Sequence, residues 1–185
     1  MSMNPSSNSL ELFEILFRQY YSKLYQIAYS ITRDKELSKD AVQQAFLQAY
    51  RKRDQLKDKG KFSAWVTTIT VNEAKNLVKS SIRLKVVPIT DITDDIKTIP
   101  VADSFEHAYL IKDQIERVLN VLSVDDSEIL VLRYYSDLTL EEIASILKIT
   151  VPNVKIRLYR ARANFKEVMS IQDASDNVQL RGKSH

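Results

Sequence analysis

The chain has 185 residues, of which 44% are hydrophobic and 28% are charged, so it is long enough for one domain or two small ones. It contains no cysteine, two histidines and two glycines, which excludes disulfide scaffolds, thiolate zinc sites and glycine-rich phosphate loops. We therefore expect no catalytic residues, no bound metal and no cofactor. The net charge is +3, so a nucleic-acid site must depend on where the charges lie.

The chain shows no sign of export or membrane insertion. Its longest apolar runs span four residues, and its first basic residue is Arg18. A membrane-spanning helix needs about 20 apolar residues, and a signal peptide begins with positive charge. We expect a soluble protein of the cytoplasm.

Residues 1–9 are rich in Ser and Asn and are predicted to be a disordered lead-in. Hydrophobic residues then recur at helical spacing in three segments, from Leu10 to Ile31, from Ser38 to Lys52 and from Phe62 to Ser80. Ser38 is a candidate N-cap of the second segment. Together the three segments predict a first helical domain over 10–83.

The pattern changes over residues 84–104, where no helical stripe continues. Within 91–106 there are five acidic residues and one lysine, a net charge of −4. This composition predicts an extended, flexible acidic linker. A strand is the alternative, but it would lack partners in a helical chain.

Helical spacing returns over 105–169 and predicts a second small domain, followed by a polar tail over 170–185 that we expect to be disordered. The predicted fold class is therefore all-α, with two small helical domains joined by an extended linker.

A helix-turn-helix pattern lies in the second domain. Thr139-Leu140-Glu141-Glu142 is a capping-box sequence, and the helix that it starts ends near Leu147. A turn over 148–150 follows, and a last helix starts near Val151 with Pro152 in its first turn. Ala144 is small where the second helix would cross the first.

The last helix also carries concentrated positive charge. Residues 148–167 contain six Lys or Arg and one Glu, a net charge of +5. A solvated basic face on an ordinary helical bundle is the alternative, but the turn spacing together with the charge favours binding in the major groove of DNA. The candidate DNA-binding residues are Asn153, Lys155, Ile156, Arg157, Tyr159, Arg160 and Arg162.

A second basic segment lies in the first domain. Residues 51–61 contain six Lys or Arg and two Asp, a net charge of +4, and lead directly into Phe62 and Trp65. Thr68, Asn72 and Asn76 follow at helical spacing. Basic, aromatic and amide side chains suit single-stranded DNA. Phe62 and Trp65 can equally be core residues, and the sequence alone leaves both interpretations open.

Two regions of the sequence, each represented by two segments, resemble one protein family. Residues 40–51 (DAVQQAFLQAYR) and 62–76 (FSAWVTTITVNEAKN) resemble region 2 of the extracytoplasmic-function (ECF, group 4) RNA polymerase sigma factors of the sigma-70 family. Residues 138–144 (LTLEEIA) and 154–162 (VKIRLYRAR) resemble their region 4. The two regions occur in the family's order and spacing.

The resemblance implies a transcription initiation subunit and not an enzyme. Region 2 would bind the clamp coiled coil of the polymerase β′ subunit through Asp40, Gln43, Gln44, Phe46 and Leu47. It would also melt and recognise the promoter −10 element, with the 54–61 loop holding a flipped base and Asn72 contacting an unpaired one. The residues implied at the −10 element are Leu56, Lys57, Lys61, Phe62, Trp65, Thr68, Asn72, Asn76 and Arg83.

Region 4 would bind the −35 duplex and the β flap of RNA polymerase core, and the acidic linker would thread into the polymerase channels. The resemblance further implies control by an anti-sigma factor, commonly membrane-anchored, in a stress response.

The chain departs from the family at four positions. Lys148 replaces a turn glycine, Pro152 and Ile156 replace small residues, and Leu56 stands where an aromatic is frequent.

Two other functions remain alternatives. A stand-alone helix-turn-helix regulator would need a dimer interface, and it leaves 10–83 unexplained. An all-helical metal-dependent phosphohydrolase would need a metal-binding motif, and we find none. Opening duplex DNA costs roughly 1.4 kcal/mol per base-pair step, so we expect the chain to melt DNA only together with polymerase.

Overall fold

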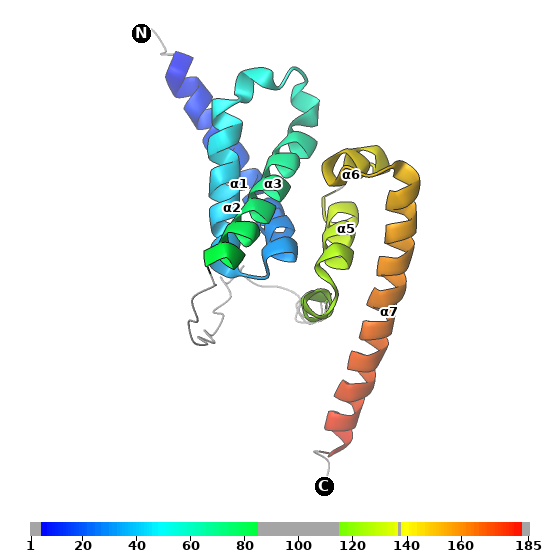
Figure 1. Cartoon of the computed structure of the whole chain (residues 1–185). Coiled ribbons are helices and arrows are strands. Elements are labelled where there is room, and N and C mark those ends of the chain that lie inside the picture. Colours follow the sequence, from blue (N-terminus) through cyan, green and yellow to red (C-terminus); the bar gives the residue numbers. More distant parts are fainter. Residues whose placement is uncertain (1–4, 85–114, 137, 183–185) are drawn as a thin grey trace.

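The computed structural model describes residues 5–84, 115–136 and 138–182 (Figure 1). Its helices are α1 (Pro5–Thr32), α2 (Lys35–Arg51), α3 (Phe62–Leu84), α5 (Val124–Tyr134), α6 (Leu140–Leu147) and α7 (Val151–Gly182). Two short 3₁₀ helices, Arg53–Gln55 and Lys59–Lys61, lie between α2 and α3. The described residues contain no strand, and the predicted all-α fold is confirmed.

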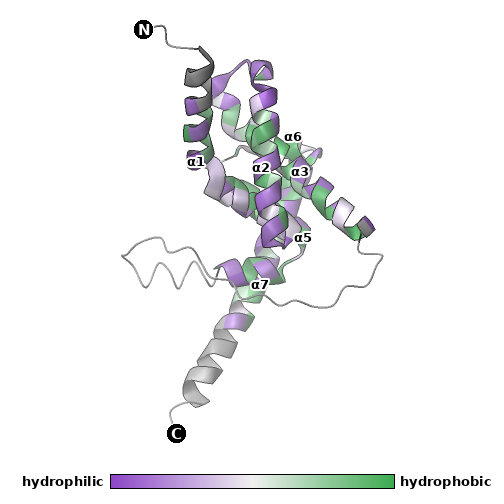
Figure 2. Ribbon diagram, turned by 90° about the vertical axis from the view of Figure 1, so that its left-hand side faces the viewer, coloured by the Kyte–Doolittle hydropathy of each residue, from purple (hydrophilic) through white to green (hydrophobic). Residues whose placement is uncertain are grey.

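Helices α1, α2 and α3 pack against one another, and we call them the N-terminal module. Their shared core contains Leu24, Ile27, Val42, Val66 and Val71, all essentially inaccessible to solvent. Hydrophobic and hydrophilic residues alternate along the same helices (Figure 2), as expected for helices that bury one face.

Helix α2 begins three residues earlier than the sequence predicted. Asp34 is its N-cap, and the carboxylate of Asp34 accepts a hydrogen bond of 2.9 Å from the backbone N–H of Leu37. Ser38, the predicted cap, is instead buried in the first turn and donates its hydroxyl to the Asp34 carbonyl. Asp is an equally good cap, and its position decided where the helix starts.

Helices α5, α6 and α7 form the C-terminal module, together with a helical segment over 115–121. Helix α7 packs against both α5 and α6, and the core contains Val118, Ile129, Leu132, Ile143 and Val154. Figure 1 shows α7 extending well beyond α5 toward the C-terminus.

The two modules are in direct contact. Helix α1 packs against α5, and α3 packs against α6, so that one hydrophobic cluster runs through both modules. Arg33, just after α1, donates hydrogen bonds to the Asn120 side chain (3.1 Å) and to the Leu122 carbonyl (3.2 Å). Partial burial there lowers the pKa of the Arg33 guanidinium from its usual value, and the group remains cationic.

Three segment boundaries differ from those predicted or fall outside the described residues. Helix α1 begins at Pro5, within the predicted disordered lead-in, and α7 continues to Gly182, through most of the predicted tail. Leu84 belongs to α3, whereas 85–104, the rest of the predicted linker, lies outside the described residues, as does 105–114.

Candidate nucleic-acid interface

A capping box fixes the start of α6. The N–H of Glu142 donates to Thr139 Oγ1 (3.2 Å), and the N–H of Thr139 donates to Glu142 Oε2 (2.8 Å). Two N–H groups that a helix start leaves without partners are thereby satisfied reciprocally. The predicted start of the first helix of the helix-turn-helix is confirmed.

The turn between α6 and α7 is tight and takes a left-handed conformation. Lys148 has φ 55° and ψ 44°, and the N–H of Ile149 donates to the Ala144 carbonyl at 3.0 Å. Ile143, Ala144 and Val154 are buried where the two helices meet. Such a turn commonly uses glycine, so the lysine carries conformational strain.

Most residues predicted to contact the −35 duplex lie exposed on α7. Asn153, Lys155, Arg160 and Arg162 face solvent, and Ile156 and Tyr159 are 59% and 73% exposed. Large exposed hydrophobic side chains between cations suit a surface that a partner covers. Arg157 differs, because its guanidinium is held by the Asp125 carboxylate at 3.0 Å.

A hollow of about 230 Å³ lies between α5, α6 and α7. Lys155 and Arg162 line it together with Arg133 and Tyr134 of α5, and Arg133 also donates to the Leu138 carbonyl at 2.8 Å. Arg133 and Tyr134 were not among the predicted site residues, because nothing in their local pattern indicates that the end of α5 meets the basic face of α7. Three cations around one hollow suit a phosphate group.

A larger hollow of about 410 Å³ lies in the N-terminal module. Its lining residues come from α1, the segment between α2 and α3, and the start of α3, and they are Phe13, Leu16, Arg53, Leu56, Lys59, Phe62 and Trp65. It combines an apolar lining with two cations at its edge. That combination suits a nucleobase with its attached phosphate.

The predicted −10 residues divide between this hollow and the surface. Leu56 and Trp65 line the hollow, half-buried, and Phe62 lines it while packing against Tyr20, with ring centroids 5.2 Å apart. Phe62 is only 7% exposed, so it is mainly a core residue. Five further residues predicted at the −10 element face solvent: Lys57, Lys61, Asn72, Asn76 and Arg83.

Thr68 neither lines the hollow nor is fully exposed. It is half-buried, and its hydroxyl donates to the Ala64 carbonyl at 2.7 Å, within α3. Arg53 and Lys59 line the hollow but were not selected as site residues from the sequence. Both belong to the basic segment 51–61, so its charge was the signal that could have indicated them.

The predicted polymerase-binding residues lie on α2. Asp40, Gln43, Gln44 and Leu47 are exposed, and Leu47 is 57% exposed despite being apolar. Phe46 is not exposed with them, because its side chain is buried and its ring packs against that of Phe17, with centroids 4.8 Å apart. An exposed leucine among polar residues suits a protein contact.

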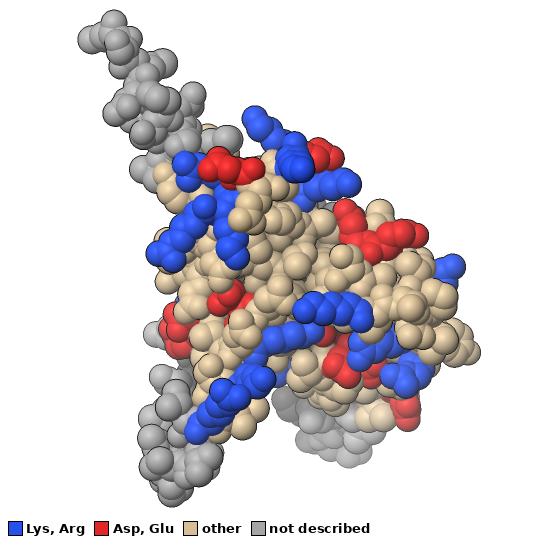
Figure 3. Space-filling view, turned by 45° about the horizontal axis from the view of Figure 1, so that its top comes forward, with Lys and Arg blue, Asp and Glu red and all other residues tan. Residues whose placement is uncertain are grey.

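Lys and Arg side chains form two groups on the face of the molecule that Figure 3 shows. In Figure 3, Lys and Arg side chains form a cluster near the top and a diagonal row below it, with Asp and Glu side chains between them. Positive side chains on this face are therefore grouped rather than evenly spread.

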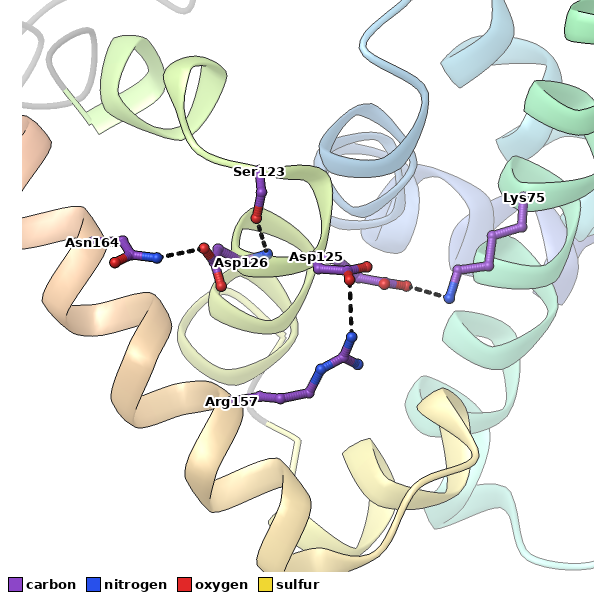
Figure 4. A network of polar contacts seen from close by, with 7 residues as sticks. Lys75, Ser123, Asp125, Asp126, Arg157 and Asn164 are labelled. Atoms are coloured by element: carbon purple, nitrogen blue, oxygen red, sulfur yellow. Dashed lines mark hydrogen bonds and ion pairs between the residues drawn. The ribbon is translucent and has the colours of Figure 1, made fainter.

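The start of α5 is an acidic turn, Asp125, Asp126 and Glu128, that contacts two other helices (Figure 4). Asp125 pairs with Arg157 of α7, and Asp126 accepts a hydrogen bond of 2.8 Å from the Asn164 amide, also on α7. Glu128 Oε1 lies 2.9 Å from Lys75 Nζ on α3, an ion pair without hydrogen-bond alignment. Burial raises the pKa of Glu128, and Lys75 opposes that shift in part.

Within residues 5–84, 115–136 and 138–182, no helix is both long and apolar enough to span a bilayer. The same residues contain no group of three or more His, Asp or Glu side chains arranged to hold a metal ion.

Comparison with known proteins matches the two modules separately. Residues 16–83 match Sigma-70 region 2, and residues 112–165 match Sigma-70, region 4. The chain belongs to the sigma-70 family of RNA polymerase sigma factors and is of the extracytoplasmic-function type. Sigma factors are transcription initiation subunits without enzymatic activity, which agrees with the sequence analysis.

Individual relatives extend the match along most of the chain. The RNA polymerase sigma-H factor of Pseudomonas aeruginosa is 29% identical over 164 residues, which cover 81% of this chain and 82% of the relative. The ECF RNA polymerase sigma factor SigM of Bacillus subtilis is 27% identical over 151 residues, 82% of this chain and 91% of the relative.

Solved structures agree with the fold. The sigma factor RpoE, solved in complex with the anti-sigma factor NepR from Bartonella quintana, has a TM-score of 0.68 at 23% identity, and the match covers 86% of this chain and 97% of that one. CnrH, solved with the cytosolic domain of CnrY, has a TM-score of 0.58 at 21% identity, with 88% and 90% covered.

Proposed function

We propose that this sigma factor binds RNA polymerase core and directs promoter-specific initiation in the cytoplasm, by recognising and melting the −10 element and by binding the −35 element. The observation that carries the proposal is the pairing of two different basic sites in one chain. One is an apolar hollow with cations at its edge, and the other is a helix-turn-helix with an exposed basic second helix.

The N-terminal module is the proposed site for unpaired −10 DNA. A flipped base would enter the hollow between Leu56 and Trp65, and Arg53 and Lys59 would contact its phosphates. The exposed amides of Asn72 and Asn76 would contact further unpaired bases on α3. Extruding a base costs a few kcal/mol, which such a hollow offsets by stacking and burial.

The C-terminal module is the proposed site for the −35 duplex. Its second helix, α7, would lie in the major groove, with Asn153, Lys155, Ile156, Tyr159 and Arg160 toward base edges. Arg133 and Arg162 would contact the phosphate backbone beside the 230 Å³ hollow.

Three protein contacts complete the proposal. The α2 face of Asp40, Gln43, Gln44 and Leu47 would bind the β′ clamp coiled coil, and the C-terminal module would bind the β flap. Two of the solved relatives are complexes with an anti-sigma factor or with a cytosolic domain of a second protein. We accordingly propose that the regulatory partner is an anti-sigma factor and that this factor is anchored in the membrane.

The test is run-off transcription on a genomic library with core polymerase, with and without the chain. We expect specific start sites only when both are present, preceded by a shared pair of sequence motifs. Tight, specific binding of duplex promoter DNA by the chain alone would instead support a stand-alone regulator. No start-site selectivity on any template would refute the proposed function.

A further inference from the structure

One side of α7 is held by the acidic turn at the start of α5 (Figure 4). It carries Arg157 and Asn164, which lie two helical turns apart and therefore face the same way. The Asp125 carboxylate pairs with the Arg157 guanidinium at 3.0 Å. The Asp126 carboxylate accepts a hydrogen bond of 2.8 Å from the Asn164 amide. We call this side of α7, with the acidic turn beside it, the acidic flank.

The opposite side of α7 carries Lys155 and Arg162. Residues two positions apart on a helix point about 200° away from each other, so Lys155 and Arg157 lie on opposite sides. Lys155 and Arg162 line the hollow of about 230 Å³ together with Arg133, from the end of α5. The described residues that line this hollow include no carboxylate. We call this side of α7, with Arg133, the basic flank.

Helix α5 produces both flanks, because it places one of its ends beside each. Between Asp125 and Arg133 it rises about 12 Å, which is close to the diameter of a helix with its side chains. Its middle is buried at Ile129 and Leu132, and α5 packs against α7. The acidic first turn of α5 therefore emerges on one side of α7, and its basic last turn emerges on the other.

The arginines on the two flanks differ in how their charge is balanced. Arg157 pairs with the full negative charge of Asp125. Arg133 and Arg162 each donate to a backbone carbonyl, at 2.8 Å and 3.2 Å, and a carbonyl oxygen carries only a partial charge. A guanidinium has several N–H donors, so Arg133 and Arg162 keep donors for a phosphate group. Arg157 would first have to leave Asp125.

We propose that Asp125 and Arg157 are a specificity-determining pair, in which Asp125 withholds the Arg157 guanidinium from DNA phosphates and confines sequence-independent contacts to the basic flank. This inference rests on the proposed function, because it assumes that α7 lies on duplex DNA. In a specific complex, base contacts fix α7 in one pose, whereas on arbitrary DNA any uncommitted cation can reach a phosphate. Withholding Arg157 therefore weakens non-specific binding and leaves the base contacts in place.

The pair contributes little to holding the fold together. The side chain of Asp125 is 68% exposed and that of Arg157 is 29% exposed. Ion pairs this accessible to water add little to folding stability. The acidic turn's buried carboxylate, Glu128, is committed to Lys75 of α3. Replacing Asp125 should therefore release Arg157 and leave the chain folded.

Binding of the full chain to a short fluorescent duplex of random sequence, at low salt, tests the pair. Asp125→Asn should bind about threefold or more tightly than the unaltered chain. The slope of log affinity against log salt concentration should steepen by about 0.9, the change expected for one further phosphate contact. Asp125→Ser, a second uncharged replacement, should give the same gain, and circular dichroism checks that both variants are folded. No gain in the folded variants would overturn the proposal.

The same comparison in an Arg157→Ala background separates the pair from a general effect of charge. There Asp125→Asn should give little gain, because no guanidinium remains to be released. Glu141→Gln is the matched control, since it removes one exposed carboxylate from the same module, and its effect should be the same with and without Arg157. Arg157→Ala alone should weaken binding less than about twofold. A larger loss, or an equal gain from Asp125→Asn in both backgrounds, would overturn the proposal.

Promoter selection by reconstituted holoenzyme measures the consequence for specificity. Asp125→Asn should use the same start sites as the unaltered chain, but unlabelled random duplex should displace it from promoters at about threefold lower concentration. Unchanged sensitivity to this competitor would overturn the proposal. Loss of the proposed function is a different result, because it would appear as absent start-site selectivity with the unaltered chain, without either substitution.

Discussion

Asp126 accepts a hydrogen bond from the amide of Asn164 at 2.8 Å, which joins the first turn of α5 to the middle of α7. Asp126 is 8% exposed, and its own N–H is capped by the Ser123 hydroxyl at 3.1 Å. Helix α7 is thus held at a fixed angle by a carboxylate that lies near the N-terminus of α5, where negative charge is favourable.

The first prediction concerns this contact. Asp126→Ala should lower the free energy of unfolding by about 1–3 kcal/mol, because it removes a charged hydrogen bond and a favourable charge at a helix start. Urea unfolding followed by circular dichroism measures the change. Asp126→Asn should recover part of it, since an amide can still pair with Asn164. Equal losses in both variants would indicate that the charge, and not the contact, matters.

The second prediction concerns the turn of the helix-turn-helix. Lys148→Gly should raise the free energy of unfolding by up to about 1 kcal/mol, because a left-handed conformation strains a residue with a Cβ atom. For a protein of this size the melting temperature should rise by about 2–4 °C. Lys148→Ala keeps the Cβ atom and should give no gain. A gain with alanine would point to the removed charge instead.

The third prediction uses the buried carboxylate of Glu128. Its pKa is raised in the folded chain from an ordinary value of 4.5, so the neutral form is favoured on folding. The stability that it contributes is fully present below pH 4.5 and is lost as the pH rises through the folded-state pKa. Glu128→Gln should therefore be more stable than the unaltered chain at pH 7.5, with the difference shrinking toward pH 4.5.

Urea unfolding at a series of pH values tests this, with Glu141→Gln, an exposed residue of α6, as the control. If Glu128→Gln is less stable than the unaltered chain at pH 7.5, the attraction between Lys75 and Glu128 exceeds the free energy that the Glu128 carboxylate loses when it is removed from water. That outcome would also mean that the Lys75–Glu128 ion pair helps to hold the two modules together.

Local signals predicted the helix-turn-helix closely. The capping box at Thr139 and Glu142 is short-range and self-contained, so its chemistry alone determined where α6 begins. The exposed cations of α7 likewise followed from helical periodicity. Helix starts without such a box were harder to predict. Two good capping residues, Asp34 and Ser38, lie four positions apart, and the sequence alone does not show that Asp34 caps α2.

Contacts between segments that are far apart in the chain could not be predicted from the sequence. Nothing near Lys75 indicates Glu128 as its partner, and the cations Arg53 and Lys59 were counted in a charged segment without being located in a hollow. Phe46 and Phe62 show the same limit, because an aromatic residue on an amphipathic helix suits a core and a binding face equally until its neighbours are known.

The fourth prediction concerns the −35 element. Arg160→Ala should weaken use of the −35 duplex by about 1–3 kcal/mol, because it removes an exposed cation from the proposed groove-facing side of α7. Binding to core polymerase should be unchanged. Lys166→Ala, further along the same helix, controls for lost charge alone and should have a smaller effect. Promoter titrations with reconstituted holoenzyme measure the first effect, and a loss of core binding would contradict the assignment.

The fifth prediction concerns the exposed amide of Asn72. Asn72→Ala should impair open-complex formation on duplex promoter DNA, because the side chain would hold an unpaired base only after strand separation. The defect should be smaller on a template with a pre-melted bubble, where the roughly 1.4 kcal/mol per base-pair step for opening has already been met. Permanganate footprinting of unpaired thymines on both templates measures it.

Lys79→Ala is the matched control, because Lys79 lies two turns further along the same exposed side of α3 and carries charge without an amide. It should weaken binding to both templates about equally and should lessen the salt dependence of binding. Equal damage by Asn72→Ala on duplex and bubble would mean that Asn72 recognises a base beyond its part in melting. No damage on either template would remove Asn72 from the site and leave the hollow at Leu56 and Trp65 as the −10 contact.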